Sequence, residues 1–201
     1  MPLESYLDPE GASQRAVRAA VADCAGVEAG EVETALDGCG APTLRLSLLG
    51  LAQAFLTWMN PEPLGSVRAA ACRRLVRAVH AEPEMVAGRD RLCTALVRSA
   101  PDRVQGKNGA EGVYAFGGRG PAGAFGVAVK VADGAERGYF PVVVALAQRL
   151  GLWSEVPVAL HRFAEPVVQN TQKLPVGEVR CTLQLPDFGA LGQVGGVEAA
   201  R

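Results

Sequence analysis

One candidate for a reactive side chain is Lys107, whose ammonium group lies in the glycine-rich stretch from Gly106 to Gly112. Glycines permit positive φ angles and close backbone approach, so a tight turn between two strands could present this lysine to a ligand. The same pattern is also typical of an ordinary β-hairpin whose lysine is solvated. The local sequence leaves both interpretations open.

A second candidate is the pair Asp37 and Cys39, a carboxylate and a thiol two residues apart in the segment 37–43, which is dense in glycine and proline. In an extended chain, residues i and i+2 face the same side, so both side chains could point at one ligand or metal ion. A purely structural turn is the competing interpretation.

The five cysteines are odd in number, lie far apart and include no Cys-x-x-Cys pair. This spacing argues against a disulfide scaffold and against a self-contained zinc knuckle. Cys24 and Cys72 lie in alanine-rich helical stretches and Cys181 in an apolar alternating stretch, so we predict that these three are buried thiols acting as small hydrophobes. Cys39 and Cys93 remain candidates for a functional role.

Composition excludes several classes of function. The chain has 201 residues and a net charge of −1, without a dense block of arginines, so we expect no nucleic-acid partner. No stretch approaches the roughly 18 apolar residues of a membrane span, and the start lacks the apolar core of a signal peptide. We therefore expect one cytoplasmic domain over residues 1–201, with no membrane contact and with a disordered tail from about residue 189.

Helical periodicity predominates up to residue 99, and strand alternation follows it. Ser66 and Asp90 are predicted helix caps, Pro141 is placed in the first turn of its helix, and His80 is interpreted as structural. The pattern predicts an α+β fold, an antiparallel sheet packed with helices. The predicted helices are 12–24, 44–59, 66–80, 90–99 and 139–150, and the predicted strands are 31–36, 103–105, 113–116, 124–131 and 176–185.

Four segments in order carry a family resemblance: 37–43, then 80–88 with Cys93 shortly after, then 106–115, then 126–134. With these motifs the chain resembles the rhizobial-type L-asparaginases, the asparaginase II family. The similarity runs from about Tyr6 to near Leu185, yet it covers only the C-terminal half of such an enzyme. It implies part of a fold similar to that of serine β-lactamases and glutaminases.

Enzymes of this family hydrolyse L-asparagine to L-aspartate and ammonia, with a serine nucleophile in a Ser-x-x-Lys arrangement. A second serine is paired with a distant lysine, and cysteines and a lysine hold a zinc ion. By position, the resemblance implies that Lys107 is the distant catalytic lysine and that Cys39 is a zinc ligand. It also implies that Asp37 and Cys93 lie at the substrate site.

The chain departs from the family because none of its six serines is followed by a lysine three positions later. We therefore expect the nucleophile, its lysine and the other zinc ligands in an N-terminal half upstream of Met1. Cys39 alone cannot hold zinc, which takes three or four protein ligands. Lys107 would need its pKa lowered by about 3 units to act as a base near neutral pH, which requires an enclosed site.

Two interpretations follow. In the first, the chain is the C-terminal portion of an asparaginase, inactive alone and completed by the missing half, while a second copy is another possible partner. In the second, it is a non-catalytic remnant or an amino-acid-binding module that folds by itself.

Overall fold

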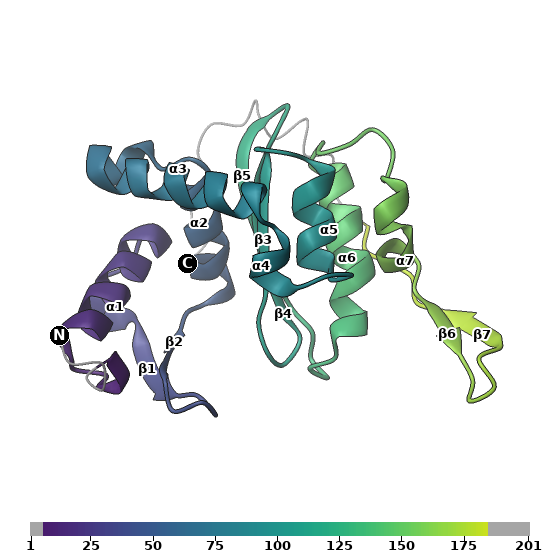
Figure 1. The fold of residues 1–201 in the computed structure, drawn as a ribbon, viewed down its shortest axis with the longest axis horizontal. Helices are drawn as coiled ribbons and strands as arrows, with labels where there is room; N and C mark the ends of the chain where they lie inside the picture. The colour runs from purple at the N-terminus through teal and green to yellow at the C-terminus, as the bar shows by residue number, and fades with distance from the viewer. Residues whose placement is uncertain (1–5, 185–201) are drawn as a thin grey trace.

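The computed structural model describes residues 6–184, so the predicted disordered tail lies outside the described part (Figure 1). Its helices are α1 (Ala12–Ala25), α2 (Leu48–Met59), α3 (Gly65–Ala81), α4 (Glu84–Ala87), α5 (Leu92–Ser99), α6 (Glu136–Arg149) and α7 (His161–Ala164). Its strands are β1 (Glu33–Leu36), β2 (Pro42–Arg45), β3 (Val104–Asn108), β4 (Val113–Gly120), β5 (Gly123–Lys130), β6 (Val167–Gln169) and β7 (Pro175–Glu178). Short 3₁₀ turns, η2 to η4, lie at Ala29–Glu31, Glu62–Leu64 and Val158–Leu160.

The centre of the molecule is an antiparallel meander in the order β3-β4-β5, which confirms the predicted α+β class. Lys107 pairs with Ala115 across β3 and β4, and Gly117 pairs with Gly126 across β4 and β5. Alternate residues of β4 point to opposite faces of the sheet, as the period of a strand requires. Each face of the sheet must therefore be covered by its own helices.

Helix α2 covers one face at two small residues (Figure 1). A Cβ added to Gly126 would overlap the carbonyl oxygen of Ala52 and lie 2.7 Å from the Leu56 nitrogen. A Cβ on Gly117 would lie 2.8 Å from the Phe55 carbonyl carbon. The helix backbone thus rests on the sheet backbone, an approach that a larger residue would prevent.

Helices α5 and α6 cover the opposite face and complete the core (Figure 1). Tyr114 and Phe116 of β4 point into this layer and are fully buried. The Tyr114 ring lies 5.1 Å from the ring of Tyr139 on α6, and Leu96 of α5 and Val143 of α6 are buried in the same cluster. This layer also carries the candidate site.

Two separate antiparallel hairpins, β1–β2 and β6–β7, flank these layers. The sequence did not predict β2 or β6. The helix predicted from residue 44 begins only at Leu48, because Ser47 caps it: its Oγ accepts a hydrogen bond from the Gly50 N–H at 3.0 Å. The predicted last strand is shorter than expected and ends at Glu178, so Cys181 lies outside it.

Two predicted helix caps are wrong. Helix α3 begins at Gly65, before Ser66, and has no side-chain cap. Helix α5 begins at Leu92, two residues after Asp90, and its start also lacks a side-chain cap. Asp90 instead has a positive φ of 57° and forms an ion pair with Arg162 at 3.3 Å, so it belongs to a turn.

Pro141 lies inside α6 instead of in its first turn, because the helix begins at Glu136, earlier than predicted.

His80 acts as the structural residue that was predicted. Its Nε2 lies 2.9 Å from the Val104 oxygen, and its Nδ1 accepts the Asp102 N–H at 3.2 Å, so the ring joins α3 to β3. Within residues 6–184, no helix is both long enough and apolar enough to cross a lipid bilayer.

Candidate functional site

Lys107 lies one residue before the end of β3, and the loop 109–112 returns the chain to β4, which confirms the predicted hairpin. Gly112 has a φ of 69° and lies so close to Gly134 that an added Cβ would be 2.8 Å from the Gly134 carbonyl carbon. The Lys107 side chain is exposed, and its Nζ donates to the backbone oxygen of Asn108 at 2.9 Å and to Asn108 Oδ1 at 3.1 Å.

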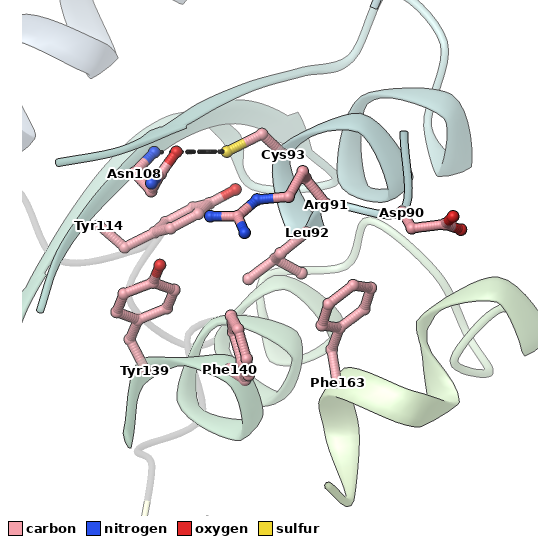
Figure 2. A pocket seen from close by; sticks show the side chains of 9 residues that line it. All are labelled: Asp90, Arg91, Leu92, Cys93, Asn108, Tyr114, Tyr139, Phe140 and Phe163. Carbon is pink, nitrogen blue, oxygen red and sulfur yellow. Dashed lines mark hydrogen bonds between the residues drawn. The ribbon is translucent and has the colours of Figure 1, made fainter. Parts of the chain in front are cut away.

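Asn108 links Lys107 to the buried thiol of Cys93, and Figure 2 shows its contact with the thiol. Cys93 lies in the first turn of α5, on the face that packs against β3, and is 2% exposed. The Asn108 N–H donates to Cys93 Sγ at 3.3 Å, and the thiol donates to Asn108 Oδ1 at 3.4 Å. The structure thus brings two predicted site residues together.

An acidic and a basic residue extend this network. Asn108 Nδ2 donates to Glu136 Oε1 at 3.5 Å, and Arg91 donates to the same oxygen at 2.9 Å. The carboxylate on one side and the two donors on the other fix the orientation of the Asn108 amide. We refer to Lys107, Asn108, Cys93, Glu136 and Arg91 as the Lys107 cluster.

A small cavity of about 30 Å³ lies beneath this cluster, bordered by Cys93, Asn108 and the rings of Tyr114 and Tyr139 (Figure 2). It has room for roughly one or two water molecules. The Tyr114 hydroxyl is completely buried and makes no hydrogen bond of ordinary geometry. Burial of an unpaired hydroxyl is costly, so a water in the cavity would be its natural partner.

Both tyrosines of the cavity keep their protons at neutral pH. Burial raises the pKa of Tyr114 well above its usual range, and the nearby Cys93 thiol acts in the same direction. Burial also raises the pKa of Tyr139, and the Glu136 carboxylate raises it further. The two phenols can therefore donate hydrogen bonds but cannot act as bases at neutral pH.

Asp37 and Cys39 lie apart from the Lys107 cluster, in the exposed loop of the β1–β2 hairpin (Figure 1). Asp37 Oδ1 accepts the Gly38 N–H at 2.7 Å, and the Asp37 N–H donates to Ala41 at 2.9 Å. The chain turns here, so the alternation argument for an extended segment does not apply to this pair. Within the described ranges, no hydrogen bond or ion pair joins this loop to Lys107.

The residues that the structure describes do not form a zinc site. Among them, no three His, Cys, Asp or Glu side chains come together as a metal-binding group. Cys39 is a free, exposed thiol, and one thiolate falls short of the three or four ligands that zinc takes. The metal role of Cys39 and the substrate role of Asp37 remain predictions.

Sequence reasoning missed several members of the site. Asn108 was adjacent to a predicted lysine, and a polar residue at the end of a strand was the signal that could have identified it. Glu136 and Arg91 are 45 positions apart in the chain and carry no spacing signal. Tyr114 was assigned only to an apolar run, because its unpaired hydroxyl is visible only in the packed structure.

The fold and site define an α+β protein with helices on both faces of an antiparallel sheet and with a lysine, amide and thiol cluster at one end of it. A family model described as L-asparaginase II matches residues 1–181. The chain therefore belongs to the L-asparaginase II family, as its motifs suggested. No curated protein matches the chain.

Proposed function

We propose that this chain supplies the lysine-bearing wall of an amidohydrolase that converts L-asparagine and water into L-aspartate and ammonia. The observation that carries the proposal is the Lys107 cluster, which lies inside the region that the family model matches. Lys107 is held by Asn108, whose amide is in turn fixed by Cys93 and Glu136. These contacts fix the position of Lys107 Nζ, from which it could exchange a proton with a substrate or a serine hydroxyl once the site is enclosed.

The nucleophile must come from another polypeptide segment, because these 201 residues contain no Ser-x-x-Lys sequence. The exposure of Lys107 supports this requirement. An ammonium in water stays protonated near neutral pH, whereas one enclosed by an apolar wall has its pKa lowered and can act as a base. We propose that the segment carrying Ser-x-x-Lys covers Lys107 and creates this enclosure.

Asp37 and Cys39 enter the proposal as residues that the added segment would complete. Cys39 would be one zinc ligand in a set whose other members lie outside the described residues, and Asp37 would lie beside the substrate. The cytoplasm is the proposed location, and the proposed substrate is a small amino acid amide.

The decisive experiment is to mix the chain with a separately produced N-terminal portion from a family member and to measure ammonia release from L-asparagine. We expect activity from the mixture and none from either part alone. Lys107→Ala should lower the activity of the mixture by about 10²- to 10⁴-fold, the usual contribution of a positioned acid or base. Lys173→Ala is the matched control, because Lys173 is an exposed lysine just before β7, and it should leave the activity unchanged.

The proposal fails if the mixture releases no ammonia. The binding-module interpretation makes the opposite prediction, namely that L-asparagine raises the melting temperature of the isolated chain in a saturable way. We expect no such stabilisation, because the cavity at the Lys107 cluster, about 30 Å³, is far smaller than an amino acid.

A further inference from the structure

A larger groove lies beside the Lys107 cluster, between α5 and the segment 157–162. Its volume is about 350 Å³, within the range of sites that hold small ligands. Arg91, Arg98 and Arg162 line it, together with one carboxylate, Asp90. Two further carboxylates, Glu84 and Glu136, pair with Arg98 and Arg91. The groove can therefore attract an anion through the guanidinium N–H donors that these ion pairs leave free, and not through an excess of charge.

The geometry of α5 places two of these arginines along one wall. Arg91 directly precedes the helix and Arg98 lies in its last turn, and a separation of seven residues, about two helical turns, puts both on the same face. Arg162 comes from α7. Apolar side chains of Ala95 and Ala159 lie between the charged groups. This combination suits an organic anion better than an inorganic one.

The arginines are paired but still have donors for a ligand. Arg98 Nη2 contacts Glu84 at 2.7 Å, Arg91 Nη2 contacts Glu136 at 2.9 Å, and Arg162 Nη2 contacts Asp90 at 3.3 Å. Each of these ion pairs engages one guanidinium nitrogen, whereas a guanidinium has five N–H donors. The Arg162–Asp90 pair is the longest of the three and is well exposed, so a ligand carboxylate could compete with Asp90 for Arg162.

We propose that this groove binds a small organic anion with two acidic groups, such as a dicarboxylate. Arg91 lines both the groove and the cavity of the Lys107 cluster, where it donates to Glu136. A ligand that engages Arg91 therefore contacts a residue that also binds Glu136, which in turn accepts a hydrogen bond from Asn108. The groove is a binding site in its own right, and its occupancy is measured without any reference to asparaginase activity.

The test is calorimetric titration of the isolated chain with succinate, with sodium chloride at equal ionic strength as the reference. We expect saturable binding of succinate and none of chloride. Arg98→Gln and Arg162→Gln should each weaken the binding by about tenfold, because each removes a charge-assisted hydrogen bond. Arg45→Gln is the matched control, since Arg45 is also an exposed arginine in an ion pair but lies outside the groove, on β2.

Asp90→Asn gives a prediction of opposite sign. It removes the negative charge of the lining and releases Arg162, so succinate should bind several-fold more tightly. Melting curves without ligand establish that each variant is folded. The proposal is overturned if succinate does not bind, if Arg45→Gln weakens binding as much as the groove variants, or if Asp90→Asn weakens it.

Discussion

The side chain of Asn108 makes hydrogen bonds in three directions, to Lys107, to Cys93 and to Glu136. Each partner comes from a different place in the chain, so this one amide couples β3 to α5 and α6. A partly buried polar network of this kind is stabilising only while its members stay paired. Changes to one member should therefore affect the others.

Cys93→Ala tests the buried thiol. The substitution removes a sulfur from a fully packed site and leaves the Asn108 backbone N–H without its acceptor, so we expect the free energy of unfolding to fall by roughly 1–3 kcal/mol. Urea unfolding monitored by circular dichroism measures it. The control is Cys39→Ala, which alters an exposed thiol and should leave stability in the absence of metal unchanged. Equal effects of the two substitutions would contradict the packing of Cys93.

At the level of elements, the contact between α2 and the sheet depends on the absence of side chains at Gly117 and Gly126. The apolar helix can bury its face because its backbone comes close to that of β4 and β5. The two outer hairpins have no comparable contact, and every residue of β6 and β7 is exposed. An isolated two-stranded hairpin is only marginally stable in water, so the central layers must provide most of the stability.

Gly126→Ala should be strongly destabilising, by about 3 kcal/mol or more, because the new methyl group would overlap the Ala52 carbonyl and force α2 away from the sheet. Thermal and urea unfolding measure the loss. Gly30→Ala is the matched control, because no atom lies within 4 Å of its added Cβ and its φ is not positive. A Gly126→Ala protein as stable as the control would show that α2 does not pack on β5 in this way.

At the scale of the whole molecule, two carboxyl groups whose pKa values are lowered in the folded chain make its stability depend on pH. Glu84 of α4 accepts hydrogen bonds from Arg98 at 2.7 Å and from Arg89 at 3.0 Å, and these bonds hold its pKa below the ordinary 4.5. The Ala135 N–H and then Arg137 hold the pKa of Asp133 below the ordinary 3.8. Both carboxyl groups therefore bind protons more weakly in the folded chain than in the unfolded chain.

It follows that the stability contributed by these two carboxylates is fully present above their unfolded pKa values and is lost as the pH falls through their folded values. The variants Glu84→Gln and Asp133→Asn should be less stable than the unmodified chain at about pH 7 and should approach it by about pH 3. Urea unfolding over this pH range provides the measurement. A difference from the unmodified chain that is the same at both ends of the range would contradict the assignment.

Much of the fold could be predicted, because the main elements have clear periodicity. The meander and the helices α1, α2, α3, α5 and α6 were all found from local pattern and turn residues. Strand β2 was missed because its four residues were divided between the predicted turn 37–43 and the helix predicted from residue 44. Strand β6 was missed because three exposed residues are too few to show an alternating pattern. The false caps at Ser66 and Asp90 have a related cause, since capping preference does not reveal where the neighbouring turn directs the chain.

For the candidate site too, some features could be predicted from the sequence and others depend on tertiary packing. Its lysine, its thiols and its family could be identified from the sequence, because residue types and motif order are properties of the chain itself. Only the tertiary structure decided that Lys107 meets Cys93 through Asn108, that Glu136 and Arg91 join them, and that Asp37 and Cys39 lie apart in another hairpin. The physical reason is that hydrogen bonds and burial depend on distances between elements, and these are set by the packing of α5 and α6 against the sheet.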